Sequence, residues 1–111
     1  MAKKPEYNYK SLQTEYGKMP PQAVDLEEAI LGSLMLEKDA FITVSDFLKP
    51  ECFYKEAHQK IYRGIQNLSL NNEPVDILTV SEEMKRLGEL EEIGGYYYLA
   101  QLTSKVASAA H

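Results

Sequence analysis

The sequence predicts an all-α fold, a compact irregular array of about five to six short-to-medium helices. Apolar residues recur at intervals of three and four in several separate segments, which is the spacing of one helix face. Prolines, glycines and capping residues stand between these segments. No convincing alternation of apolar and polar residues, the pattern of a half-buried strand, appears. The 111 residues are enough for one small core.

Residues 1–20 are predicted to form a disordered arm, and residues 21–111 a helical domain. The arm is polar, and its three tyrosines lack helical spacing. Pro20 and Pro21 end it, because paired prolines oppose helix on both sides.

The first helix is predicted to begin at Asp25, which forms a capping-box pattern with Glu28. Its inward face is expected to hold Leu26, Ala29, Ile30, Ser33 and Leu34. Gly32 costs this helix about 1 kcal/mol relative to alanine, which indicates a neighbouring helix packed closely against it. Asp39 is the expected N-cap of a second helix that ends before Pro50. Its inward residues are expected to be Ala40, Val44, Phe47 and Leu48.

The longest helix is predicted over about residues 54–68, with Phe53 entering the core just before it. Its buried stripe is expected to comprise His58, Ile61, Tyr62, Ile65 and Leu68. Glu56 and Lys60 on its outer face form a favourable pair one turn apart.

A turn at residues 71–74 precedes a fourth helix, which is predicted to begin near Asp76 or Thr79. Thr79 with Glu82 forms a second capping-box pattern, and Gly88 suits the position just past the helix end. The inward residues of this helix are expected to be Ile77, Val80, Met84 and Leu87. Leu90 and Ile93 are expected to anchor a short link. Gly94 and Gly95 then open a last helix along which lie Tyr96, Leu99, Leu102, Thr103 and Val106.

The sequence offers little support for catalysis, a cofactor or a metal ion. It contains no G-x-x-x-x-G-K-[ST] loop to hold nucleotide phosphates. Cys52, His58 and His111 share no metal-ligand spacing. A thiolate–imidazole pair of Cys52 and His58 lacks an evident third group to orient it. We therefore expect that the chain neither hydrolyses ATP nor unwinds DNA.

Two aromatic features allow alternative interpretations. His58 is expected to be a core histidine bonded to a backbone carbonyl or a carboxylate, with pH sensing as the alternative. Tyr96, Tyr97 and Tyr98 point about 100° apart on a helix, so at least one ring should reach the surface. An interface anchor is favoured over base stacking for these candidate interface residues, because no basic residues lie between them.

Charge and cysteine content indicate partners and location. The chain carries a net charge of −5, and its arm carries four lysines against two glutamates, so the folded part carries −7. An acidic body disfavours phosphate backbones, although a basic arm leaves weak nucleic-acid contact open. The one cysteine cannot form an internal disulfide, and no apolar run approaches membrane-spanning length. A cytoplasmic location without a membrane partner is expected.

Five segments taken together resemble the amino-terminal domain of bacterial replicative DNA helicases of the DnaB type. They are LEEAILGSLMLEKDAF, FYKEAHQKIYRGI, PVDILTV, which contains Asp76, IGGYYYLAQL and VASAAH. They follow the family's order and separations over residues 21–111. Two departures lie at the final boundary, where Ala107 replaces the usual proline and His111 the usual asparagine.

The resemblance implies a collar domain that sits above an ATP-driven motor ring, with six copies associated as a trimer of dimers. It implies docking of primase and, in some bacteria, of a helicase loader. The RecA-like motor domain, which uses ATP and Mg²⁺ and engages DNA, is expected to lie outside this chain. The parent protein would unwind duplex DNA at the replication fork. A small stand-alone helical DNA-binding module is the alternative function, and a stand-alone enzyme is a third.

Overall fold

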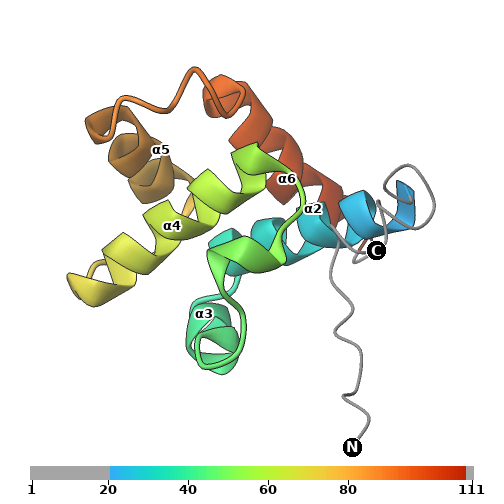
Figure 1. Cartoon of the computed structure of the whole chain (residues 1–111), viewed down its shortest axis with the longest axis horizontal. Helices are drawn as coiled ribbons and strands as arrows, with labels where there is room; N and C mark the ends of the chain where they lie inside the picture. The colour runs from blue at the N-terminus through green and yellow to red at the C-terminus, as the bar shows by residue number, and fades with distance from the viewer. Residues whose placement is uncertain (1–20, 110–111) are drawn as a thin grey trace, which may run out of the picture.

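The computed structural model describes residues 21–109, and within that range the chain is all-α (Figure 1). The predicted fold class is confirmed, because those residues form helices and turns without any strand. The elements are α2 (Pro21–Leu36), α3 (Ala40–Val44), the 3-10 helix η1 (Pro50–Cys52), α4 (Glu56–Leu70), α5 (Ile77–Arg86) and α6 (Gly95–Ala109). The predicted arm and His111 lie outside the described residues.

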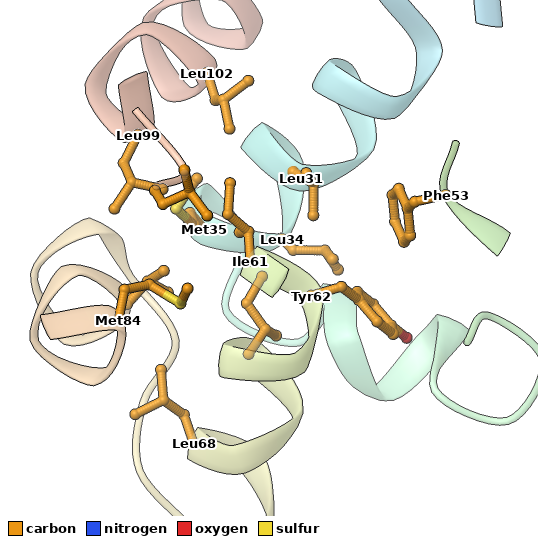
Figure 2. Packing of buried hydrophobic residues seen from close by; sticks show 13 residues of the cluster. Leu31, Leu34, Met35, Phe53, Ile61, Tyr62, Leu68, Met84, Leu99 and Leu102 are labelled. Carbon is orange, nitrogen blue, oxygen red and sulfur yellow. The ribbon is translucent and has the colours of Figure 1, made fainter. Parts of the chain in front are cut away.

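The helices surround one core. Helix α6 packs mainly along α2, and α4 contacts α2, α5 and η1 (Figure 1). The buried hydrophobic residues come from α2, α4, α5, α6 and two connecting segments (Figure 2). They are Leu31, Leu34, Met35, Phe53, Ile61, Tyr62, Ile65, Leu68, Val80, Met84, Ile93, Leu99 and Leu102.

Tyr62 is the largest fully buried side chain. Its ring lies 5.2 Å from that of Phe53 and 5.7 Å from that of Phe41, measured between centroids. Its hydroxyl donates a hydrogen bond to the Leu48 carbonyl oxygen at 2.7 Å. Burial raises the pKa of Tyr62 to about 12, so the phenol stays a donor and holds the segment after α3 against α4.

Helix α2 differs from the prediction in both its start and its buried face. It begins at Pro21, where the missing N–H costs nothing, so Asp25 lies inside the helix and caps nothing. Its buried residues are Glu27, Leu31, Gly32, Leu34 and Met35. The prediction of Leu26 as a core residue is wrong, because 56 % of it is exposed. Ile30 is half-buried and packs against the core.

The segment after α2 also differs from the prediction. Asp39 precedes α3 but makes no side-chain cap hydrogen bond. The helix ends at Val44, and the N–H groups of Phe47 and Leu48 both bond to the Val44 carbonyl. This tight turn changes the register, so Leu48 packs against the core while 68 % of Phe47 is exposed. The predicted inward position of Phe47 is therefore wrong.

Helix α4 keeps the predicted stripe, and its bounds lie two residues later than expected. Its buried residues are His58, Ile61, Tyr62, Gly64, Ile65 and Leu68. The predicted pair of Glu56 and Lys60 is present, with 3.7 Å between carboxylate oxygen and Nζ. Lys60 also pairs with Glu92 in the link before α6, and that hydrogen bond raises the pKa of Lys60.

Helix α5 starts through a different capping box from the predicted one. The Thr79 N–H donates to Asp76 Oδ1 at 2.9 Å, and the Asp76 N–H donates to Thr79 Oγ1 at 2.9 Å. The Thr79–Glu82 box is therefore wrong, because Asp76 comes first and takes Thr79 as its partner. Gly88 follows the helix with a φ of 74°, as the predicted end requires. Leu87 is 37 % exposed, which corrects its predicted inward position.

Replacing Asp76 with alanine should lower the free energy of unfolding by about 0.5–2 kcal/mol, the usual value of an N-cap side chain. Asp39→Ala is the matched control, because Asp39 precedes α3 without a side-chain cap bond. Urea denaturation of both variants measures the difference. Equal losses at the two positions would contradict the role of Asp76.

Gly94, just before α6, and Gly95, its first residue, both have positive φ, 109° and 73° respectively. A Cβ atom on Gly94 would lie 2.8 Å from Cβ of Tyr98. Glycine is required at Gly94 for its backbone conformation and for this close approach. The turn therefore sets the position of Tyr98 one helical turn into α6.

Candidate functional site

A buried polar cluster joins the three helices α2, α4 and α6. Glu27 on α2 and His58 on α4 are both completely buried, and Glu27 Oε1 lies 2.7 Å from His58 Nδ1. The other ring nitrogen, Nε2, lies 2.6 Å from the Tyr98 hydroxyl on α6. The three side chains therefore form one continuous hydrogen-bonded chain.

Glu27 also accepts hydrogen bonds from backbone at the start of α4. The Tyr54 N–H donates to Oε2 at 2.6 Å, and the Lys55 N–H donates to Oε1 at 3.4 Å. A carboxylate near a helix N-terminus satisfies N–H groups that have no partner within the helix. Glu27 thus supports α4 as an N-terminal anchor supplied by α2.

The partners fix the roles of the atoms in this cluster. An ionised carboxylate can only accept, so His58 Nδ1 carries a proton toward Glu27. In the neutral imidazole, Nε2 then accepts the hydrogen bond of the Tyr98 hydroxyl. The rings of His58 and Tyr98 are stacked at 6.0 Å between centroids and 8° between planes.

Tyr98 is the outermost member of this cluster and is partly exposed. Its hydroxyl is 3.5 Å from Glu28 Oε2, and Lys55 Nζ is 5.5 Å from the centroid of its ring. Burial, and then the negative charge of Glu28, raise the pKa of Tyr98. The phenol consequently remains protonated and continues to donate at neutral pH.

The order carboxylate, imidazole and hydroxyl also occurs in nucleophilic catalysis. Here the hydroxyl is a phenol whose pKa is raised, and the imidazole is completely buried. The alternative pair of Cys52 and His58 is excluded, because both His58 nitrogens are bonded to other groups. The cluster therefore links α2, α4 and α6 through hydrogen bonds between buried side chains.

Replacing Tyr98 with phenylalanine should lower the free energy of unfolding by about 1–3 kcal/mol, because His58 Nε2 loses its partner. Tyr97→Phe is the matched control, since 73 % of Tyr97 is exposed. Chemical denaturation at pH 7 measures both. Equal stability of the two variants would contradict the bond to His58.

The Tyr98→Phe variant should also change how the free energy of unfolding depends on pH in the alkaline range. The folded-state pKa of Tyr98 is raised above its ordinary value of 10.0, so the stabilisation is complete below that pH and is lost as the pH rises beyond it. Phenylalanine cannot ionise, so the free energy of unfolding of Tyr98→Phe should fall less than that of the unchanged chain as the pH rises above 10.

The three consecutive tyrosines do not share one environment. Tyr96 and Tyr97 are 46 % and 73 % exposed, whereas Tyr98 packs against the core. Tyr98 is therefore removed from the set of candidate interface residues, because its hydroxyl is taken by His58. Tyr96 and Tyr97 remain on the surface.

Sequence reasoning missed Glu27, the residue that anchors the cluster. The available signal was its spacing, since Glu27 precedes the buried residues Leu31 and Leu34 by four and seven positions. A glutamate at a core position of a helix needs a buried partner. His58, which was already expected to need a carboxylate or carbonyl, is that partner.

Large hydrophobic side chains are exposed at several places on the described surface. They are Leu26, Leu36, Ile42, Phe47, Leu70, Leu78, Leu87, Tyr96 and Tyr97. Residues 21–109 contain no group of three or more histidine, cysteine, aspartate or glutamate side chains placed to hold a metal ion. Among the helices of that range, none has the length and apolar character needed to cross a membrane.

The charged side chains of the surface are mainly acidic. Residues 21–109 carry eight lysines and arginines against 15 aspartates and glutamates. Lys105 is bonded to Glu28 and Asp25, which raises its pKa, and Arg86 is bonded to Glu83, whose pKa it lowers. These pairings reduce the positive charge that could meet a phosphate backbone.

This arrangement defines a small, acidic, all-helical domain with a polar cluster inside and apolar side chains on its surface. The family model of the DnaB-like helicase N terminal domain matches residues 19–111. The chain belongs to this family of helicase N-terminal domains, and the resemblance found in the sequence is confirmed.

Known relatives agree with this assignment. The chain is 48 % identical over 101 residues to the replicative DNA helicase DnaB of Rhodothermus marinus, covering 91 % of the chain and 11 % of that protein. It is 42 % identical over 94 residues to DnaB of Geobacillus stearothermophilus, covering 85 % and 21 %. The chain thus spans a small fraction of these curated relatives.

A solved structure has the same fold. The crystal structure of the N-terminal domain of DnaB helicase from Mycobacterium tuberculosis superposes with a TM-score of 0.74 at 43 % sequence identity. The similarity covers 79 % of this chain and 64 % of that one. The helical array of Figure 1 is therefore that of a DnaB-type N-terminal domain.

Proposed function

We propose that this chain is the assembly and partner-docking domain of a replicative DNA helicase that unwinds duplex DNA at the replication fork. Its membership of the helicase N-terminal domain family is the observation that carries this proposal. In the parent protein, copies of the domain associate into a hexameric ring. A separate motor domain binds ATP and Mg²⁺, hydrolyses the nucleotide and engages DNA in the cytoplasm.

The surface of the domain supports docking of proteins. Tyr96 and Tyr97 present aromatic rings on α6, and such rings are frequent anchors of protein interfaces. The excess of acidic over basic side chains disfavours direct duplex binding. Primase is the partner we propose, and a helicase loader is a further one.

Calorimetric titration of the chain with the carboxy-terminal domain of the cognate primase tests this function. The expected result is binding to primase and no tight binding to single-stranded DNA under the same buffer. Affinity for one domain should be modest, because a ring presents several copies at once. A reconstituted hexamer of the parent protein should therefore bind more tightly than the isolated chain.

Matched variants locate the contact. Replacing Tyr96 and Tyr97 together with serine should weaken primase binding, whereas Leu78→Ser changes an exposed residue on another helix and should not. Tight DNA binding without primase contact, also in the hexamer, would reject the docking function. It would favour a helical DNA-binding module instead.

A further inference from the structure

A second apolar surface lies away from the tyrosines, where the ends of α2 and α4 meet α3. Leu36, Ile42 and Leu70 are 49 %, 70 % and 80 % exposed there. We call these three residues, together with Phe41 and Ser69 between them, the α3–α4 patch. Figure 1 shows α3 and the C-terminal end of α4 at the same side of the molecule.

Two hollows belong to this patch. The first, of about 580 Å³, has Leu36, Phe41, Ile42 and Ser69 in its walls. The second, of about 400 Å³, has Phe41, Ser69 and Leu70 in its walls. Because Phe41 and Ser69 belong to the walls of both, the two hollows are neighbours on the surface.

The charged residues in the walls of the first hollow are mostly negative. The walls of the first hollow include Asp39, Glu73 and Asp76 against a single lysine, Lys38. The Asp76 carboxylate is used by the Thr79 N–H. Asp39 and Glu73 have no side-chain hydrogen bond or ion pair within residues 21–109, so both can accept one from a positive group, although the charge of Glu73 also contributes to the raised pKa of Arg86.

We propose that the α3–α4 patch docks a basic amphipathic helix of a partner protein. Its apolar stripe would cover Leu36, Ile42 and Leu70, and its flanking lysines or arginines would face Asp39 and Glu73. Apolar anchors at helical spacing can each enter one of two neighbouring hollows. This proposal rests on the proposed docking function and deepens it by giving the partner's chemistry.

The negative charge of this patch disfavours a second copy of the chain as its occupant. A second copy of this chain docked by the same patch would place Asp39 and Glu73 opposite the same carboxylates of its partner. Like charges face to face in an interface oppose association. A basic partner helix meets no such repulsion, and the −7 charge of the folded part attracts it.

The test uses a synthetic 18-residue peptide of leucine, alanine and lysine, with leucines on one helical stripe and lysines on both flanks. Binding is followed by fluorescence anisotropy and by amide chemical-shift changes of the isotope-labelled chain. The expected shifts concentrate at residues 36–42 and 69–75. The same peptide with glutamate in place of lysine should bind at least about tenfold more weakly.

Variants separate apolar contact from charge. Ile42→Gln with Leu70→Gln should weaken peptide binding about tenfold. The control pair, Leu78→Gln in α5 with Leu87→Gln just after it, should leave binding unchanged. Asp39→Asn with Glu73→Gln should weaken binding about threefold and reduce its salt dependence. All six positions are exposed, so the folded state should persist, which circular dichroism checks.

Several outcomes would overturn the proposal. These are shifts centred on Tyr96 and Tyr97, equal binding of the glutamate peptide, or equal effects of the patch and control variants. Concentration-dependent self-association that Ile42→Gln with Leu70→Gln abolishes would assign the patch to a second copy. If primase binds normally to those variants and the peptide does not bind, the docking function stands and the patch proposal fails.

Discussion

Replacing Glu27 with alanine is expected to lower the free energy of unfolding by about 3–5 kcal/mol, because each buried donor left without its acceptor costs about 1–3 kcal/mol. Three N–H groups lose their acceptor at once, on His58, Tyr54 and Lys55. A cavity also opens at a completely buried position of α2. Such a loss is a large part of the stability of a small domain.

Denaturant unfolding followed by circular dichroism measures this effect, and Glu56→Ala is the matched control. Glu56 also pairs with a basic side chain, Lys60, but 81 % of its own side chain is exposed. Its removal is therefore expected to leave stability almost unchanged. If Glu27→Ala is too unstable to study, Glu27→Gln keeps the shape of the side chain. It should still be clearly destabilised, because the NH2 group of its amide is a hydrogen-bond donor and would face N–H groups that are also donors.

A double-mutant cycle then tests the pairing itself. Glu27→Ala and His58→Ala should together cost clearly less than the sum of the two single changes, because each alone leaves the other's polar group unpaired in the core. Additive losses would show that the two side chains are energetically independent. That result would contradict the cluster as the link between α2 and α4.

Replacing Gly32 with alanine is expected to destabilise the domain by about 1–3 kcal/mol, although alanine favours helix at this position. The new Cβ would overlap the carbonyl oxygen of Leu102 and lie 2.7 Å from Cγ2 of Val106. Backbone cannot yield as a side chain can, so α2 and α6 must move apart along their main contact.

Gly64→Ala is the informative comparison. Gly64 is also buried inside a helix, but its new Cβ would meet the sulfur of Met84 at 2.8 Å. A thioether at the end of a flexible side chain can shift, so the gain in helix propensity should offset most of the strain. Thermal unfolding of both variants decides the point. Equal losses would show that close approach of α2 and α6 does not explain Gly32.

The sequence by itself determined the helical class and the orientation of α4. That helix carries charged side chains on one side and the apolar stripe around Ile61 and Ile65 on the other, so only one face can be buried. The positions of the turns at Gly88 and Gly94 could also be predicted from the sequence. Both glycines have positive φ, which other residues rarely adopt.

Only the tertiary structure decided which face of α2 is buried. Residues 29–36 of that helix are apolar or small on every side, so periodicity allowed Leu26 inward as well as Leu31. Contact with both α6 and α4 selects the side of Glu27, Leu31 and Met35. The face that the sequence favoured remains partly open to solvent.

The polar cluster also depended on tertiary structure. Glu27 is 31 residues before His58, and Tyr98 is 40 residues after it. No local sequence pattern relates positions so far apart. Sequence required that a buried histidine find a partner, because an unpaired polar group in a core is costly. The packing of α2 and α6 around α4 decided which carboxylate and which hydroxyl form hydrogen bonds with His58.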